Sequence, residues 1–192
     1  MKNKVFLYGA PGSGKTTLGK SLSAALGVKF VDLDGFIENH ASSSVREIFE
    51  RFGEERFREI ESSCLSQVCS REGVEIVSLG GGTLLREDNR SLCERKGVVI
   101  LLEAPPAAEL ARRLGVNPSS RPLGNMAEQR SSHYASFQRR VSATFQLADS
   151  LVMVGRSIAE PFLGEKLVVD ENVKSLYPDM FADAIATVPS GE

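Results

Sequence analysis

The stretch from Gly9 to Thr17 reads GAPGSGKTT and constrains this chain more than any other part of its sequence. It contains the complete pattern G-x-x-x-x-G-K-[ST], after an apolar run (Val5–Tyr8) and before a helical pattern (Thr16–Leu26). Such a loop turns backbone N–H groups onto phosphate oxygens, and the helix N-terminus adds a partial positive charge. The pattern predicts binding of a nucleoside triphosphate with Mg²⁺. In this site Lys15 contacts the β- and γ-phosphates and Thr16 ligates the metal. The remaining nucleotide contacts are expected from Gly12, Ser13, Gly14 and Thr17.

Further apolar runs predict four more strands, at Lys29–Leu33, Glu75–Leu79, Val98–Leu102 and Ser150–Val154. Most are continuously apolar, which is typical of strands covered on both faces. Helical patterns lie between them, including Val45–Ser70, with a break expected at Gly53, and Met126–Leu147. This alternation predicts one α/β domain over residues 1–192, with a parallel sheet and helices on both faces.

Composition limits the partners and the compartment. The net charge of -2 offers no electrostatic reason to expect nucleic acid or an anionic membrane as a partner. No apolar run approaches the roughly 18–20 residues that span a bilayer. Cys64, Cys69 and Cys93 are too few for a disulfide framework and have no zinc-site spacing. We expect a cytoplasmic protein with reduced core thiols and without a nucleic-acid or membrane partner. His40 and His133 are expected to be surface or helix-packing residues.

Two carboxylates follow the second predicted strand in the stretch VDLDGFIE. In extended chain Asp32 and Asp34 share a face, at the carboxyl end of the sheet where open α/β folds bind ligands. One could hold the water shell of a metal, and the other could take the proton of an attacking hydroxyl. The alternative is a turn in which Asp34 caps the following helix.

Two more motifs suggest the other half of a site. In FGEERFREIES, Arg56 and Arg58 lie beside an apolar stripe of Phe49, Phe52, Phe57 and Ile60. An arginine fork suits a carboxylate ligand, although a solvated arginine that pairs with Glu55 or Glu61 is the alternative. In SLGGGTLL, three consecutive glycines (Gly80, Gly81, Gly82) indicate a backbone brought close to a ligand, or else a tight turn.

In this order and spacing, the phosphate loop, DLDGFIE, FREIE, SLGGG and RPL resemble the shikimate kinase family, from Val5 to about Val154. The resemblance implies a P-loop NTPase fold of three layers, α/β/α. Its five-stranded parallel sheet has the order 2-3-1-4-5, and a mobile lid lies at about 115–125. It also implies ATP-dependent phosphorylation of the 3-hydroxyl of shikimate by a monomer. The tail at about 157–192 does not resemble the family.

The resemblance also implies residue roles. Lys15, Asp34 and Arg121 are the catalytic residues, with Arg121 as the lid arginine and Asp34 orienting the acceptor hydroxyl. Thr16 and Asp32 serve the metal, and Arg113 packs on adenine. The substrate residues are Asp34, Arg58, the three glycines, Arg140, Phe49 and Phe57.

Some residues depart from the family pattern. The lid reads R-P-L-G where the family has R-P-L-L. The second substrate arginine normally sits in R-x-P-L-Y, nine residues before the Asp of an A-D pair. Counting back from Asp149 identifies Arg140, and Arg139 stays open. The alternative functions are another P-loop small-molecule kinase, such as a gluconate or nucleotide kinase, and a non-catalytic binding module of the same fold.

Overall fold

The computed structural model describes residues 3–103 and 130–142. Their helices and strands follow one another along the chain as β1 (Lys4–Tyr8), α1 (Lys15–Leu26), β2 (Lys29–Asp32), α2 (Leu33–Ala41), α3 (Val45–Ser70), β3 (Glu75–Ser78), the 3₁₀ turn η1 (Thr83–Leu85), α4 (Glu87–Lys96), β4 (Gly97–Glu103), α7 (Ser131–Ala135) and β5 (Arg140–Ser142). None of the helices within these ranges is long and apolar enough to cross a membrane.

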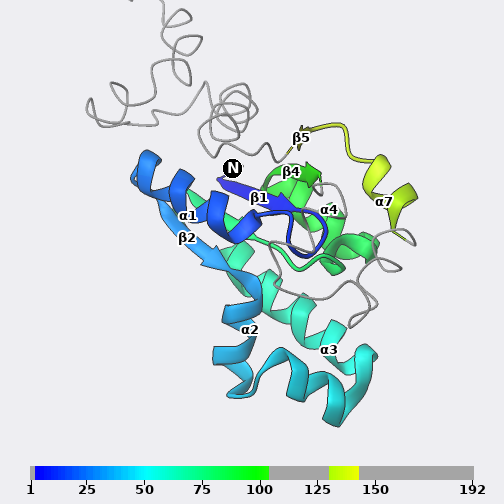
Figure 1. The fold of residues 1–192 in the computed structure, drawn as a ribbon. Coiled ribbons are helices and arrows are strands. Elements are labelled where there is room, and N and C mark those ends of the chain that lie inside the picture. Colours follow the sequence, from blue (N-terminus) through cyan, green and yellow to red (C-terminus); the bar gives the residue numbers. More distant parts are fainter. Residues whose placement is uncertain (1–2, 104–129, 143–192) are drawn as a thin grey trace, which may run out of the picture.

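The five strands form one parallel sheet in the order β2-β3-β1-β4-β5. This is the order expected from the sequence, with β1 at the centre (Figure 1). Parallel pairing brings the carboxyl ends of the strands to one edge. The loops after β1, β2 and β3 therefore begin at the same edge, and these loops carry the motifs of the sequence.

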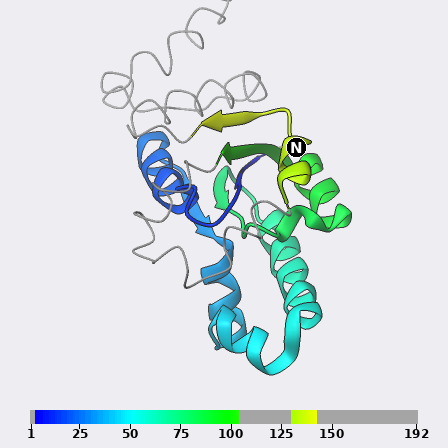
Figure 2. The same cartoon turned by 45° about the vertical axis from the view of Figure 1, so that its right-hand side comes forward.

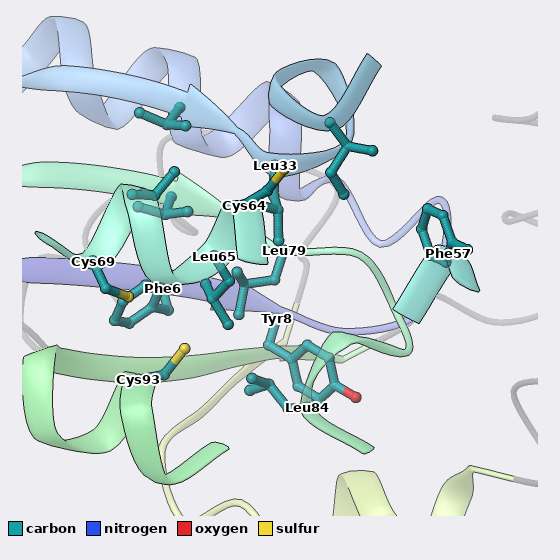
Figure 3. Close-up of a cluster of buried hydrophobic side chains, with 14 of the residues drawn as sticks. Phe6, Tyr8, Leu33, Phe57, Cys64, Leu65, Cys69, Leu79, Leu84 and Cys93 are labelled. Atoms are coloured by element: carbon teal, nitrogen blue, oxygen red, sulfur yellow. The ribbon is translucent and has the colours of Figure 1, made fainter. Parts of the chain in front are cut away.

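Successive residues of β1 point to opposite faces of the sheet, and each face has its own apolar cluster. Val5 and Leu7 pack with the apolar side of α1, through Leu18, Leu22 and Leu26. Phe6 and Tyr8 pack on the other face, in a cluster that draws on α2, α3 and α4 (Figure 3). The sheet is therefore covered on both faces, which explains its continuously apolar strands.

Helices α2 and α3 form an arm that projects from the sheet beyond β2 (Figures 1 and 2). A capping box starts α3: the Ser44 hydroxyl accepts a hydrogen bond from the Glu47 N–H (3.2 Å), and the Glu47 carboxylate accepts one from the Ser44 N–H (2.8 Å). The predicted break is confirmed at Gly53, whose φ of 79° and ψ of 176° are essentially restricted to glycine. The bend separates the tip of the arm from the part of α3 that faces the sheet.

The prediction of a helix over Met126–Leu147 is wrong for the described part of that range. The structure has only the short helix α7, a turn and then β5. The Leu101 N–H donates to the Arg139 carbonyl (2.9 Å), and Val141 is buried in the apolar cluster on the α1 side. Pairing with the free edge of β4 therefore prevails over helical propensity. The fifth strand is Arg140–Ser142, and the predicted strand Ser150–Val154 lies outside the described residues.

Candidate active site

The loop between β1 and α1 has the conformation that a phosphate loop requires. Gly9, Gly12 and Gly14 have φ values of 143°, 78° and 93°, in the region that favours glycine. Lys15 is buried and donates to the carbonyls of Gly9 (2.9 Å) and Ala10 (2.8 Å). Its burial lowers the pKa of the ammonium group to about 8, against the opposing charges of Asp34 and Asp32. The loop thus folds around a single buried cation.

One buried polar atom of this loop fits a phosphate ligand. The Ser13 hydroxyl oxygen is buried and has no hydrogen-bond partner among the described residues. Buried hydroxyls are nearly always hydrogen-bonded, so such an atom suggests a missing ligand. Phosphate oxygens at the start of α1 would satisfy this hydroxyl together with Lys15.

The carboxylates after β2 differ in position from the extended arrangement expected from the sequence. Strand β2 ends at Asp32 and Leu33 already begins α2, so Asp34 lies in the first helical turn. The residue that caps α2 is Asp32, which accepts hydrogen bonds from the N–H groups of Asp34 (3.2 Å) and Gly35 (3.4 Å). Asp32 also accepts from the Thr16 hydroxyl (2.8 Å). Capping by Asp32 leaves the carboxylate of Asp34 available to the site.

Asp34 combines solvent access with an unfavourable setting for its charge. The side chain is exposed on one side. Desolvation by its other neighbours, followed by the like charges of Asp32 and Glu61, raises the pKa of Asp34 to about 6, and Lys15 opposes this rise. A carboxylate with such a pKa is ionised at pH 7 yet basic enough to take a proton from a hydroxyl in a transition state.

Arg58 on α3 is held by two carboxylates. Its Nη1 lies 2.7 Å from Oε2 of Glu61, and its Nη2 lies 3.2 Å from Oε1 of Glu54. Glu61 is 1% exposed, and its other oxygen accepts from the Thr83 hydroxyl at 2.6 Å. The Arg58 side chain is only 15% exposed, so it is not solvated, although the pairing with Glu61 considered as the alternative from the sequence is present. The guanidinium is instead fixed in direction, whereas Arg56 pairs with Glu59 in an exposed contact.

Gly80 and Gly82 touch the charged side chains of the site. A Cβ on Gly80 would lie 3.2 Å from Oδ1 of Asp34, and a Cβ on Gly82 would lie 2.6 Å from Nη2 of Arg58. Between them, a Cβ on Gly81 would lie 3.1 Å from the Gly9 carbonyl of the phosphate loop. The triplet therefore joins the phosphate loop, the base candidate Asp34 and the arginine in one site, and side chains there would displace these groups.

Aromatic residues flank this centre. Phe49 and Phe57 pack together on α3 with ring centroids 4.4 Å apart, and the Arg58 guanidinium lies 5.1 Å from the Phe57 ring centroid. Phe52, expected in the same apolar stripe, is instead 55% exposed. On the other side of the triplet, the hydroxyls of Tyr8 (3.1 Å) and Tyr134 (2.8 Å) donate to the Gly81 carbonyl.

A second arginine near the site was missed by the sequence analysis. Arg130 directly precedes α7, and its charge opposes the rise that burial causes in the pKa of the Tyr134 phenol. Burial raises the pKa of Tyr8, and the charges of both Arg130 and Arg58 oppose that rise, so the two arginines act on the same residue. The sequence does contain a signal for this arginine. Arg130 and Tyr134 have the same spacing as the Arg and Tyr of the family pattern R-x-P-L-Y, although the Pro and Leu between them are missing.

The remaining candidates lie elsewhere. Arg140 begins β5, and its Nε lies 3.3 Å from Oε1 of Glu103 in a half-exposed pair on the outer strands of the sheet. Neighbouring Arg139 is the residue whose carbonyl receives the Leu101 N–H. Arg113, Arg121, the lid at 115–125 and the tail at 157–192 lie outside the described residues.

Comparisons with known proteins identify similar chains. The family model described as shikimate kinase matches residues 11–173. A shikimate kinase of Clostridium beijerinckii is 34% identical over 175 residues, which are 91% of this chain and 99% of that protein. The crystal structure of the Bacteroides thetaiotaomicron shikimate kinase matches with a TM-score of 0.71 and 31% identity, over 80% of this chain and 97% of that one. A structure of the Acinetobacter baumannii shikimate kinase in complex with shikimate matches with a TM-score of 0.68 and 25% identity, over 87% and 96%.

Proposed function

This chain belongs to the shikimate kinase family, and we propose that it transfers the γ-phosphate of ATP to the 3-hydroxyl of shikimate. The products are shikimate 3-phosphate and ADP. Because the chain belongs to this family, the alternative functions of gluconate or nucleotide kinase are no longer needed to explain its sequence.

The observation that carries the proposal is the contact of Gly80 with Asp34 and of Gly82 with Arg58. Two residues of chain span at most about 7 Å, so a proton acceptor and a carboxylate-binding group face one short stretch of backbone. A six-membered ring that bears a carboxylate and hydroxyls has these dimensions and functional groups. The arrangement therefore supports an acceptor such as shikimate.

On the donor side, Lys15 and the loop N–H groups would hold the phosphates, and Lys15 would offset the charge that develops on the transferred group. The Thr16 hydroxyl and the Asp32 carboxylate, 2.8 Å apart, provide the hard oxygen ligands that Mg²⁺ prefers. Bound there, Mg²⁺ would supply neutralising charge for the phosphates. Asp34 would accept the proton of the attacking hydroxyl as the new P–O bond forms and the bond to ADP breaks.

On the acceptor side, we propose that Arg58 and Arg130, rather than Arg140, bind the substrate carboxylate. The Glu103 pair of Arg140 and the proximity of Arg130 to Tyr8 and Tyr134 support this choice. Phe49 and Phe57 would form the apolar wall of the pocket, and Arg121 would act from the lid.

The proposal extends to a cytoplasmic monomer without a nucleic-acid or membrane partner. The three cysteines are free and buried in the apolar core, as suits a reducing compartment.

The test is a coupled ADP-release assay with shikimate, gluconate and the common nucleoside monophosphates. Of these acceptors, we expect only shikimate to raise the rate of ADP release. A rate of ADP release that shikimate does not raise would overturn the proposal. Arg58→Ala and Arg130→Ala should each raise the shikimate KM by at least about tenfold, because a charged contact is lost. The matched control, Arg140→Ala, should leave the shikimate KM unchanged. A rise for Arg140→Ala without one for Arg130→Ala would restore the assignment made from the sequence.

A further inference from the structure

The Gly81 carbonyl receives two tyrosine hydroxyls, which is more than a tight turn requires. A carbonyl oxygen has two lone pairs, and the hydroxyls of Tyr8 (3.1 Å) and Tyr134 (2.8 Å) use both of them. The donors come from distant parts of the chain, since Tyr8 ends β1 just before the phosphate loop and Tyr134 lies on α7. Two separate elements therefore fix one peptide group in the middle of the glycine triplet.

Both tyrosine rings are held in place by packing. Tyr8 is completely buried, and its ring centroid lies 5.4 Å from that of Tyr134 and 5.2 Å from that of Phe137. Figure 3 shows the Tyr8 ring in the apolar cluster beside Leu84, with its hydroxyl directed away from Leu65 and Leu79. Burial raises the pKa of both phenols, so both remain protonated donors over the working pH range.

The orientation of this peptide group decides where its N–H points. In a trans peptide the C=O and the next N–H point in opposite directions, so a Gly81 carbonyl turned to the tyrosines turns the Gly82 N–H away from them. Among the described residues, no hydrogen bond uses the N–H groups of Gly80, Gly81 or Gly82. Gly80 and Gly82, which carry two of these donors, adjoin Asp34 and Arg58, so their N–H groups are available to a ligand oxygen in this site.

We propose that Tyr8 and Tyr134 are positioning residues that together hold the Gly81–Gly82 peptide with its N–H presented to the acceptor's oxygen atoms. This inference rests on the proposed function. The tyrosines do not touch the acceptor themselves but act through the backbone between them and the pocket. The charge of Arg130 also acts on the Tyr134 phenol, which makes Tyr8 the cleaner position for a test.

The two donors predict a non-additive response to substitution. In Tyr8→Phe or Tyr134→Phe the carbonyl keeps one hydroxyl, so each single variant should raise the shikimate KM by only about threefold. The double variant leaves the carbonyl without a donor and frees the peptide to rotate. We expect its KM to rise at least about tenfold beyond the product of the two single effects. The kcat and the KM for ATP should change less than about twofold, because the phosphate loop keeps its apolar support.

A matched control separates this effect from general loosening of the aromatic cluster. Phe137→Leu removes a ring that packs on Tyr8 but leaves both hydroxyl bonds to Gly81, so the shikimate KM should stay at the wild-type value. A second readout is NMR and needs no turnover. The chain has 17 glycines, and in protein labelled with ¹⁵N-glycine the addition of shikimate without ATP should shift the Gly82 amide signal. That shift should be lost in the double variant.

The outcomes are distinguishable. Wild-type protein that does not phosphorylate shikimate would refute the proposed function. If the wild type is active, any of three results would overturn the positioning role. The effects of the two tyrosine substitutions on the shikimate KM could be independent, or Phe137→Leu could raise this KM as much as the double variant does. The third result is a Gly82 signal that shikimate still shifts in the double variant.

Discussion

Substitution of Glu61 by glutamine tests the link between the buried charges of the site and its chemistry. The Glu61 carboxylate forms an ion pair with Arg58 (2.7 Å) and accepts a hydrogen bond from the Thr83 hydroxyl (2.6 Å), and the residue is 1% exposed. Glutamine keeps the shape and can keep the Thr83 contact, but it removes the charge opposite Arg58. The matched control is Glu54→Gln, which removes the other partner of Arg58 from a side chain that is 66% exposed.

The two variants should differ in stability. A hydrogen bond to a charged group contributes about 1.5–3 kcal/mol, and Arg58 would keep Glu54, so we expect Glu61→Gln to lose about 2 kcal/mol of unfolding free energy. An orphaned buried charge would cost more, about 3–5 kcal/mol. The exposed pair with Glu54 should contribute about 0.5 kcal/mol or less. Urea unfolding followed by circular dichroism measures both values, since the chain has no tryptophan for fluorescence.

The activity of Glu61→Gln should change in two ways. Arg58 loses the partner that directs it, so the shikimate KM should rise by about tenfold. The Glu61 charge is also one of the causes, after desolvation and Asp32, that raise the pKa of Asp34. Its removal should lower that pKa and move the acid limb of the kcat/KM profile to lower pH. Equal unfolding midpoints for the two variants, or an acid limb that moves to higher pH, would refute this reasoning.

Three other predictions follow from single positions. The pH profile of the wild-type kcat/KM should be bell-shaped, falling below about pH 6 as Asp34 becomes protonated and above about pH 8 as Lys15 loses its charge. The variant Asp34→Asn should abolish transfer but leave ATP binding measurable by calorimetry. Loss of both transfer and binding would indicate a structural role for Asp34. Gly82→Ala should raise the shikimate KM by about tenfold, since its Cβ would lie 2.6 Å from Nη2 of Arg58 and displace the guanidinium; an unchanged KM would contradict the contact. Gly97→Ala should instead lose about 1–3 kcal/mol of unfolding free energy at unchanged KM, because its Cβ meets the backbone carbonyl of Lys4 in the neighbouring strand; a stable variant would contradict this packing.

The parts of the fold that the sequence predicts are those with local causes. Four strands, the helix after the phosphate loop and the break at Gly53 follow from continuous apolar runs, the loop pattern and glycine chemistry. A capped helix start was only the alternative, with Asp34 as the cap instead of Asp32, because extended chain and a helix start look alike over the residues VDLD. The consequence for Asp34 is favourable, since the cap formed by Asp32 leaves its neighbour free for the site.

The end of the described chain was not predictable in the same way, because a three-residue edge strand has almost no signal of its own. Strand β5 exists because β4 offers an unpaired edge and because Val141 and Phe137 find apolar partners on opposite faces of the sheet. The count of nine residues back from Asp149 relied on the spacing of the family pattern, and it assigned the substrate arginine to Arg140, which begins β5.

The position of β5 bears directly on the choice between the two arginines. Arg140 starts a strand two strands away from β1, and its guanidinium lies beside Glu103. Arg130 precedes the helix that carries Tyr134, and Tyr134 is tied to the Gly81 carbonyl at 2.8 Å. A movement of the glycine triplet therefore reaches, through the Tyr134 hydroxyl, the helix that follows Arg130, whereas Arg140 would respond only through the sheet. For this reason the Tyr8→Phe/Tyr134→Phe double variant should weaken the effect of a subsequent Arg130→Ala substitution on the shikimate KM, and it should leave Arg140→Ala without effect.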